Sequence, residues 1–296
     1  MREFVYNPAK TGPRMTIVCF VSGSGTNYRE IVKRDPAHDY LVFTNRPGCQ
    51  GTEIARQFGH PVVELSHAPY LKDLRKIYGA GNVPRNCPER ESFEKEVINR
   101  IETKLGRQPD LICLAGYDLV NTDWMVDRYY PRILNVHPGD SSLGYIGLHW
   151  VPAVRAIMAG EKALRSTLFF IDKGLDTGAI LVQSKPLEIN KTLAELDLSN
   201  GTNLLDKFRK VMEYSRINKI QSYEDYSASF TLELKKGMEE ICSGLQAALK
   251  VSGDWQIYPF GVHDLIAQGR VEVEGRRIFV DGCELPLYGY RLDAKK

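Results

Sequence analysis

The sequence contains no hydrophobic run long enough to cross a membrane, and its 39 basic residues nearly balance its 37 acidic residues. The resulting net charge of +2 gives no electrostatic reason to expect binding to nucleic acid or to a membrane surface. The first 14 residues also lack the apolar core of a signal peptide. These absences predict a cytoplasmic protein with neither nucleic acid nor membrane among its partners.

Cysteine is scarce, and none of the six cysteines forms a CxxC pair. Cys19 and Cys113 lie inside apolar runs and are expected in the hydrophobic core. No cysteine or histidine spacing predicts a disulfide framework or a zinc site. We therefore expect a reduced protein without a metal.

What the sequence does have is an alternation of short apolar runs and helix-like segments, which suits a chain of 296 residues with 43% hydrophobic composition. The alternation predicts an α/β fold, a Rossmann-like and mostly parallel sheet with helices on both faces. The expected strands are 15–21, 40–44, 61–65, 110–115, 133–136, 166–171 and 179–184. The expected helices are 28–34, 52–58, 88–106, 122–129 and 150–159. Residues 69–88, with several glycines and prolines, are expected to be mostly loop.

One stretch, Pro131 to Gly139, combines a buried strand with two chemically active side chains. Asn135 and His137 are two residues apart, so on an extended backbone both side chains leave the same face. Pro138 ends the strand, which puts both at a carboxyl strand end, where open α/β sheets bind ligands. An amide can hold a polarised carbonyl oxygen, and an imidazole can move a proton near neutral pH. A structural histidine is the alternative.

A second stretch, Ser22 to Asn27, is a glycine-rich turn between a strand and a helix. Such a turn directs backbone N–H groups and a helix dipole at an anion, although it can also be a turn without a ligand. The dinucleotide fingerprint is incomplete, because Tyr28 occupies the third glycine position and no acidic residue follows the next strand at Asn45 and Arg46. A dehydrogenase is therefore the weaker interpretation.

A third stretch, Gly174-Leu175-Asp176-Thr177-Gly178, is predicted to be a turn between two strands. Aspartate often only forms such turns. If Asp176 approaches His137, it can instead orient the imidazole and raise its basicity.

Together, these segments resemble the folate-dependent formyltransferases, closest in layout to the branch of phosphoribosylglycinamide formyltransferase. The residues that carry the resemblance are 21–27, 114–117, 134–138, 147–149 and 175–178, with 257–259, 269–270, 281–282 and 285–286 towards the end. The resemblance covers about 15–184 and 255–290. The order of Asn-x-His-Pro followed by a Leu-Asp-x-Gly turn is its most specific part.

The resemblance implies the formyltransferase fold and a reaction in which a primary amine attacks the formyl carbon of 10-formyltetrahydrofolate. It assigns oxyanion stabilisation to Asn135 and His137, proton transfer to His137, and orientation of that imidazole to Asp176. It also assigns binding of the acceptor's phosphate to Gly23, Ser24, Gly25, Thr26 and Asn27. Folate binding falls to Gly116, Tyr117, Asp118, Leu119 and Val120, and to Asp172, Lys173 and Gly174. Glycinamide ribonucleotide, a purine precursor, is the leading acceptor.

The sequence departs in three places from the pattern of the phosphoribosylglycinamide formyltransferase branch. Gly139 to Ser142 replace Ser-Leu-Leu-Pro, Asp118-Leu119 replace Met-Arg, and Phe169 replaces a histidine. The acceptor therefore stays open between glycinamide ribonucleotide and another amine, such as a sugar nucleotide. A 10-formyltetrahydrofolate hydrolase is less expected, because the N-terminal regulatory domain common in those enzymes is missing from this sequence. A non-catalytic nucleotide-binding module is the alternative from another class.

The predicted domain organisation has four parts, namely an N-terminal arm (1–14), a catalytic domain (15–190), a helical insertion (191–252) and a C-terminal helix and hairpin (253–296). The arm is expected to be loose. The insertion carries apolar residues at helical spacing, which predicts a helical pair packed on the main domain or a contact in a homodimer. The hairpin is expected from 271–274 and 277–280 around Gly275.

Overall fold

The computed structural model describes residues 2–79 and 82–294. Met1 of the predicted arm, residues 80–81 of the predicted loop and the last two residues of the C-terminal segment lie outside that range. The chain divides into two compact units. The first unit comprises Met1–Val136, Phe169–Ala179 and Tyr258–Leu285, and the second comprises His137–Leu168, Ile180–Ile257 and Pro286–Lys296.

The first unit contains five strands in the order β6-β5-β2-β3-β4, with every pairing parallel. They are β2 (Thr16–Val21), β3 (Asp39–Thr44), β4 (Val62–Glu64), β5 (Leu111–Leu114) and β6 (Ile133–His137, of which His137 belongs to the second unit). In the register, Ile17 of β2 faces Tyr40 of β3 on one side and Leu111 of β5 on the other. The predicted α/β fold class with a mostly parallel sheet is confirmed.

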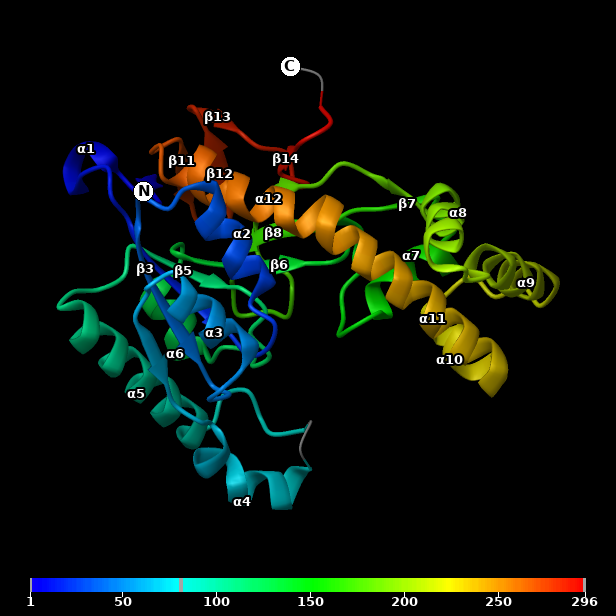
Figure 1. Cartoon of the computed structure of the whole chain (residues 1–296), viewed down its shortest axis with the longest axis horizontal. Coiled ribbons are helices and arrows are strands. Elements are labelled where there is room, and N and C mark those ends of the chain that lie inside the picture. Colours follow the sequence, from blue (N-terminus) through cyan, green and yellow to red (C-terminus); the bar gives the residue numbers. More distant parts are fainter. Residues whose placement is uncertain (1, 80–81, 295–296) are drawn as a thin grey trace. The chain divides into compact units, whose positions relative to one another are not determined.

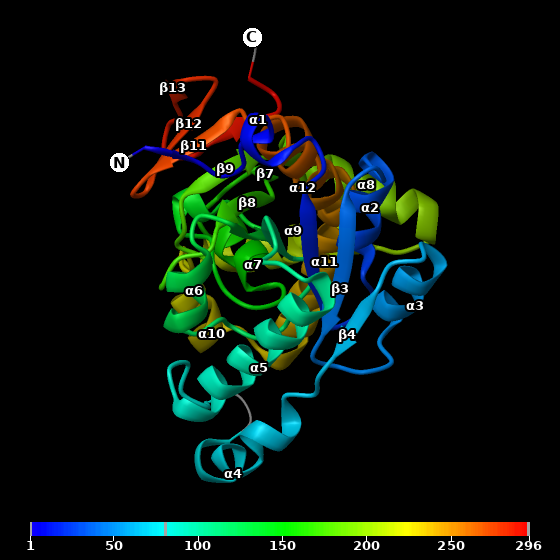
Figure 2. The ribbon, with the colours of Figure 1, turned by 90° about the vertical axis from the view of Figure 1, so that its left-hand side faces the viewer.

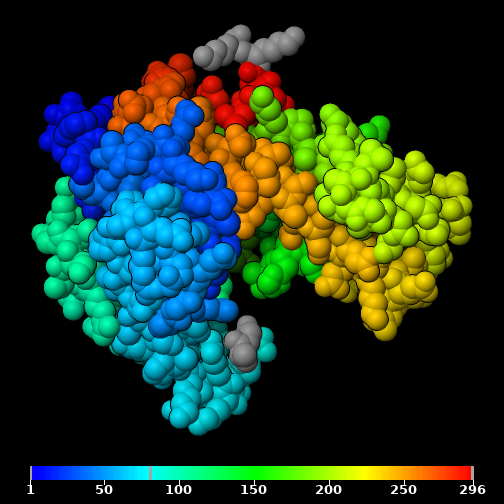
Figure 3. Space-filling model, in the orientation of Figure 1, coloured from blue at the N-terminus to red at the C-terminus, as the bar shows by residue number. Residues whose placement is uncertain are grey.

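Helices cover both faces of these strands, as Figures 1 and 2 show. The helices α2 (Thr26–Arg34) and α3 (Gln50–Gln57) lie on one face, and α5 (Pro88–Leu105) and α6 (Asp123–Tyr129) lie on the other. Phe93, Val97 and Ile101 of α5 pack with Phe20 and Phe43 of the strands. On the opposite face, the side chains of α2 and α3 form a continuous blue surface in Figure 3. Burial on both faces explains why β2 is a continuous apolar run.

An antiparallel sheet of four short strands also belongs to the first unit. The predicted hairpin is confirmed as β11 (Val271–Glu274) and β12 (Arg277–Val280). It pairs with β1 (Glu3–Phe4) on one side and with β13 (Cys283–Glu284) on the other. The predicted loose arm is therefore wrong, because β1 and the short helix α1 (Pro8–Thr11) give it regular structure.

The second unit is mainly helical. Its helices are α7 (Val151–Met158), α8 (Ile189–Asn200), α9 (Leu204–Ile217), α10 (Tyr223–Ser229) and α11 (Leu232–Leu249). Its short strands are β7 (Ala163–Leu164), which pairs with β10 (Leu187–Glu188), and β9 (Ile180–Gln183), which pairs in parallel with β14 (Tyr290–Arg291). The 3-10 helix η1 (Ser141–Leu143) and the π-helical η2 (Lys250–Asp254) also belong to it. The insertion, which is described throughout, thus contains four α-helices and the start of η2 rather than the predicted pair.

Three further elements lie at or between these parts. Strand β8 (Thr167–Phe170) and helix α12 (Trp255–Pro259) contain boundaries between the units, and the π-helical η3 (Phe260–Ile266) follows α12. The helix α4 (Ala68–Tyr78) occupies much of the segment expected to be loop. Pro69 in its first turn and Gly79 after its end fit helix-terminus preferences. Leu71, Leu74 and Tyr78 recur at helical spacing, although only Leu71 of this helix is buried.

Candidate active site

The strand order of the first unit reverses at β2, because the chain runs from β2 to β3 on one side and later to β5 on the other. In open α/β sheets, ligands bind outside the carboxyl strand ends at such a switch point. Ser22, which follows β2, donates its backbone N–H to the carbonyl of Gly116, which follows β5, at 3.0 Å. The structure therefore brings the predicted phosphate segment against the predicted folate segment.

A partly buried side-chain network fixes this junction. The hydroxyl of Ser22 donates to Oδ1 of Asn45 at 2.6 Å, and Nδ2 of Asn45 donates to Oδ1 of Asp118 at 2.8 Å. The backbone N–H of Asp118 donates to the Ser22 hydroxyl at 3.0 Å. Asn45, buried directly after β3, was not among the predicted site residues, and its position at a strand end beside the switch point is the signal that could have found it.

Asp118 is held in its charged form. Burial opposes ionisation of this carboxyl, but the hydrogen bond from Asn45 and the nearby charge of Arg46 help to lower its pKa. In the related branch, Met-Arg occupies the positions of Asp118 and Leu119. Here the anionic Asp118 pairs with the cationic Arg46. Arg46, which follows the same strand as Asn45, is therefore engaged by Asp118.

The glycine-rich turn is shaped by the packing of α3. Gly25 has a left-handed φ of 64°, and a Cβ there would collide with Cα of Gly51. The backbone N–H of Gly51 donates to the carbonyl of Gly23 at 2.9 Å. Within the described residues, Oδ1 of buried Asn27 has no hydrogen-bond partner. An unsatisfied buried acceptor in this turn suits a ligand that carries a donor group.

Asn135 lies on β6 in the first unit. The buried hydroxyl of Tyr258 donates to the carbonyl of Leu134 at 3.1 Å, directly before Asn135. Tyr258 belongs to the C-terminal segment, so that segment fixes the strand on which Asn135 lies. Asn135 itself is half-buried among buried neighbours.

His137, the last residue of β6, belongs to the second unit. Its Nε2 lies 3.0 Å from the carbonyl of Tyr145, which can only accept, so Nε2 carries the proton in this contact. A neutral ring then has its lone pair on Nδ1. A Cβ on Gly139 would lie 2.9 Å from Nε2 of His137 and 2.5 Å from the Tyr145 carbonyl oxygen. Gly139 stands where the family pattern has serine, and its lack of a side chain is what allows the contact between His137 and the Tyr145 carbonyl.

The turn of Asp176 belongs to the first unit and depends on both of its glycines. A Cβ on Gly178 would collide with the carbonyl of Phe170, and one on Gly174 would collide with the Thr177 hydroxyl. Asp176 adopts a left-handed φ of 54°, which aspartate tolerates better than most residues. These constraints give the Gly-Leu-Asp-Thr-Gly pattern a physical reason.

The other predicted folate residues have mixed environments. The ring of Tyr117 packs against Phe20 in the core, and burial raises the pKa of its hydroxyl. Lys173 is exposed and bonds to Asp127 at 2.8 Å, and that bond raises the pKa of its ammonium group. Leu119 also packs against the core, whereas Val120 is exposed. Side-chain contacts with a ligand are therefore better suited to Asp118 and Val120 than to Tyr117.

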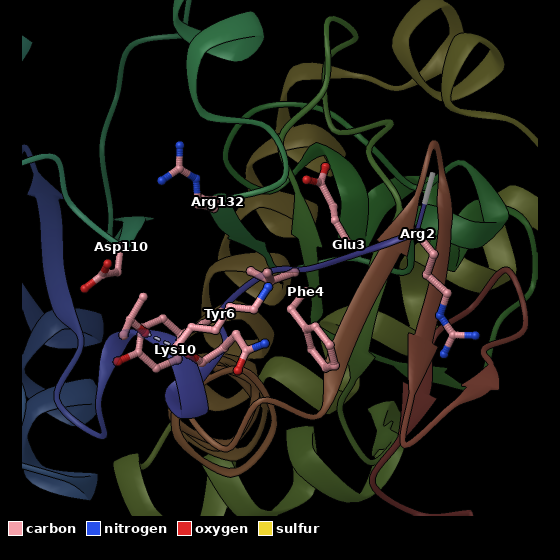
Figure 4. Close-up of a pocket in the computed structure, with 10 residues that line it drawn as sticks. Arg2, Glu3, Phe4, Tyr6, Lys10, Asp110 and Arg132 are labelled. Atoms are coloured by element: carbon pink, nitrogen blue, oxygen red, sulfur yellow. Dashed lines mark hydrogen bonds between the residues drawn. The ribbon is translucent and has the colours of Figure 1, made fainter.

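The first unit also has a cavity of about 510 Å³, which is separate from the predicted site residues. Figure 4 shows it between the arm residues Arg2 to Lys10 and the side chains of Asp110 and Arg132. Its described lining includes none of the predicted site residues. That lining carries charges of both signs without a histidine or a cysteine, so it gives no reason to move the candidate chemistry there.

A cluster of metal-ligating residues, Asp35, His38 and His263, also lies in the first unit. Nε2 of His263 donates to the carbonyl of Ile31 at 2.8 Å, and Nδ1 of His38 accepts from the backbone N–H of Met15 at 3.2 Å. Among the described residues, Nε2 of His38 and Nδ1 of His263 have no hydrogen-bond partner. That the enzyme needs no metal stays a prediction.

The sequence of the chain matches the formyl transferase family model over residues 15–207, which include all the predicted site residues. The chain belongs to the formyl transferase family. The expected resemblance is therefore confirmed at the level of the family.

Several similar proteins carry the name of one formyltransferase. The chain is 27% identical over 176 residues to phosphoribosylglycinamide formyltransferase of Escherichia coli, a match that covers 58% of this chain and 72% of that enzyme. It is 32% identical over 178 residues to the trifunctional purine biosynthetic protein adenosine-3 of Drosophila melanogaster. That match covers 58% of this chain and only 12% of the fly protein, so the chain corresponds to a small part of that relative.

The fold agrees with solved formyltransferase structures. The phosphoribosylglycinamide formyltransferase of Coxiella burnetii superposes with a TM-score of 0.60 at 22% identity, covering 94% of this chain and 99% of that chain. Glycinamide ribonucleotide transformylase 1 of Symbiobacterium toebii gives a TM-score of 0.59 at 24% identity, covering 91% and 95%. Among the described residues, no helix is long and apolar enough to span a membrane.

Proposed function

We propose that the chain transfers a formyl group from 10-formyltetrahydrofolate to the primary amine of glycinamide ribonucleotide, a step of purine biosynthesis. The observation that carries the proposal is the set of family motifs within residues 15–207. Asn135 and His137 lie at the end of one strand, and the phosphate and folate segments meet at the switch point. The names of the relatives support glycinamide ribonucleotide as the acceptor.

The proposed chemistry uses three side chains. The amine nitrogen attacks the formyl carbon, and the carbonyl oxygen becomes an oxyanion that accepts hydrogen bonds from the Asn135 amide and the His137 imidazole. His137 takes the proton that the attacking nitrogen loses and gives it to the folate nitrogen as the bond between the formyl carbon and that nitrogen breaks. Asp176 orients the imidazole. Proton transfer of this kind contributes about 10²–10⁴-fold to the rate.

Binding is proposed to use the two segments at the switch point. Gly23, Ser24, Gly25, Thr26 and Asn27 would hold the phosphate through backbone N–H groups, and Gly116 to Val120 together with Asp172 to Gly174 would hold the folate. The left-handed φ of Gly25 supports phosphate binding. Gly25 caps the N-terminus of the nine-residue helix α2, where backbone N–H groups can face an anion. A cytoplasmic location and a homodimer stay predictions.

The test measures tetrahydrofolate formation from 10-formyltetrahydrofolate with glycinamide ribonucleotide, with a panel of sugar and nucleotide amines, and without an acceptor. We expect formation that depends on glycinamide ribonucleotide, and a loss of about 10²-fold in kcat for Asn135→Ala, as expected for one oxyanion donor. Formation without any acceptor would identify a hydrolase.

The same measurements distinguish a formyltransferase of another pathway from a non-catalytic protein. Formation with a different amine would keep the mechanism and change the pathway. A binding module would retain its ligand affinity after substitution of Asn135 or His137 and would show no turnover in the unmodified chain.

A further inference from the structure

The turn of Asp176 is held by contacts that come from outside the motifs. Asp172, two residues before the turn begins, accepts from the backbone N–H of Gly174 at 2.9 Å and from the Thr177 hydroxyl at 2.8 Å, both through Oδ1. One carboxylate oxygen therefore ties the two ends of the loop that carries Asp176. The second oxygen, Oδ2, is available for another partner.

That partner is Arg276, which lies 104 residues further along the chain. Arg276 follows Gly275 at the tip of the β11–β12 hairpin. Its guanidinium donates to Oδ2 of Asp172 and to the backbone carbonyl of Thr177. One planar group thus bonds both sides of Asp176, which is the geometry that arginine provides and lysine does not.

The hairpin tip has a second anchor. The hydroxyl of Tyr130 donates to the carbonyl of Gly275, and Tyr130 lies three residues before β6 begins. The same tip is therefore bonded to the segment that leads into the strand of Asn135 and to the turn of Asp176.

Arg85 holds the opposite side of the turn. Its guanidinium donates to the carbonyls of Lys173 and Asn121, the latter at 2.5 Å. Asn121 directly follows the predicted folate segment Gly116 to Val120. The turn is thus fixed between two arginines, and Arg276 is the one that bonds to residues on either side of Asp176.

We propose that Arg276 is a positioning residue for formyl transfer, because it holds the 172–177 turn in the conformation that presents Asp176. The proposal rests on the proposed function. Arg276 lies outside residues 15–207, which match the family model.

The geometry differs from an ordinary surface ion pair. Exposed pairs contribute little, since solvent screens them and both side chains lose conformational freedom. Here the Asp172 side chain is only 17% exposed and is already ordered by two other donors, while Arg276 is 66% exposed. The second bond of Arg276, to a backbone carbonyl, fixes the chain itself. Its loss should therefore change the position of the turn more than the stability of the molecule.

The experiment compares Arg276→Ala with Arg277→Ala in the full chain. Arg277 is the matched control, because it is adjacent, exposed and paired with Glu284 of the same small sheet. For Arg276→Ala we expect kcat to fall about 10-fold with an unchanged KM for the amine, less than the roughly 10²-fold that a 1 Å misplacement can cost. Arg277→Ala should stay within about twofold of the unmodified chain, and Arg276→Lys should recover only part of the loss.

Hydrogen exchange of the 172–178 amides is measured on the same proteins, with faster exchange expected only for Arg276→Ala. In an Asp172→Asn background the further effect of Arg276→Ala should shrink, because the two groups act together. Equal kcat and equal exchange for Arg276→Ala and the unmodified chain would overturn the proposal, as would an equal loss in both arginine variants. If the unmodified chain turns over no acceptor, the proposed function fails. The exchange result alone then decides whether Arg276 holds the turn.

Discussion

At the scale of single residues, the candidate site depends on glycines that no side chain can replace. Gly139, Gly174 and Gly178 lie where a Cβ would meet neighbouring atoms, and none of them has a left-handed φ. Their role is therefore close approach between segments rather than backbone freedom. This distinguishes them from turn glycines such as Gly12 and Gly116, which have a positive φ and open space around them.

Gly139→Ala tests this role at His137. The added methyl group would press on Nε2 of His137 and on the Tyr145 carbonyl, so the imidazole or the loop must move. We expect kcat to fall about 10²-fold, as for a misplaced reacting group, and stability to fall by about 1–3 kcal/mol through overpacking. Steady-state kinetics and urea unfolding measure the two effects.

The control for this prediction is Gly237→Ala. Gly237 lies in α11 with open space around its Cβ position. Alanine there should leave kcat unchanged and raise stability by roughly 0.5–1 kcal/mol, because glycine is unfavourable inside a helix. An unchanged kcat in Gly139→Ala would show that the imidazole tolerates a different loop conformation.

The sequence predicts the candidate site residues that lie in motifs, but it does not predict the distant contacts that hold them. Asn135, His137 and Asp176 follow recognisable patterns at strand ends and turns. The partners of these segments, Tyr258 and Arg276, are joined to them across 124 and 104 residues, respectively. No local pattern predicts such contacts, since they depend on how the whole first unit folds.

At the scale of elements, the insertion is built around α11. Met238, Ile241, Cys242, Leu245 and Leu249 of this helix are fully buried and pack with residues of α7, α8 and α9. The apolar stripe predicted from the sequence is thus a core stripe. The arm was missed for a physical reason, because β1 depends on a partner strand some 270 residues away. The helix α4 was missed because the glycines and prolines of residues 69–88 indicated a loop, although its apolar residues recur at helical spacing.

Leu245→Ala tests the core role of α11. Leu245 is 0% exposed, so truncation should cost about 2–5 kcal/mol of stability by leaving a cavity. Leu232→Ala, in the same helix at 70% exposure, should change stability by less than about 0.5 kcal/mol. Chemical denaturation followed by circular dichroism compares the two. A small cost for Leu245→Ala would instead favour an insertion that packs loosely.

At the scale of the whole molecule, two buried groups make stability depend on pH with opposite signs. Burial raises the pKa of Asp254 in the second unit to about 6, against the opposing bond from Ser166. Burial lowers the pKa of His263 in the first unit to about 4. Both groups favour their neutral forms in the folded chain. High pH therefore lowers stability through Asp254, and low pH lowers it through His263.

For Asp254, the favourable neutral form is fully present below the unfolded pKa near 3.9 and is lost as pH rises through about 6. Asp254→Asn keeps an acceptor for Ser166 and removes the buried charge. We expect it to raise the free energy of unfolding by roughly 2–3 kcal/mol at pH 8 and by little at pH 4. Urea unfolding at both pH values measures the difference.

His263→Gln provides the opposite case. The stability that neutral His263 provides is present above pH 6.5 and is lost as pH falls towards about 4, so the stability of the variant should depend less on pH in that range.

An Asp254→Asn effect of equal size at pH 4 and pH 8 would mean that Asp254 does not titrate as a buried acid.

The link between the hairpin tip and the turn of Asp176 also has a consequence for the synthesis of the chain. A ribosome adds about 5–20 residues per second, so the 104 residues between Asp172 and Arg276 take roughly 5–20 s to make. During that interval the catalytic motifs have already been translated, but the hairpin that secures the turn has not. The nascent chain therefore secures this turn only after Arg276 has been made, and ribosome-bound chains that stop before Arg276 should be poor catalysts although they contain Asn135, His137 and Asp176.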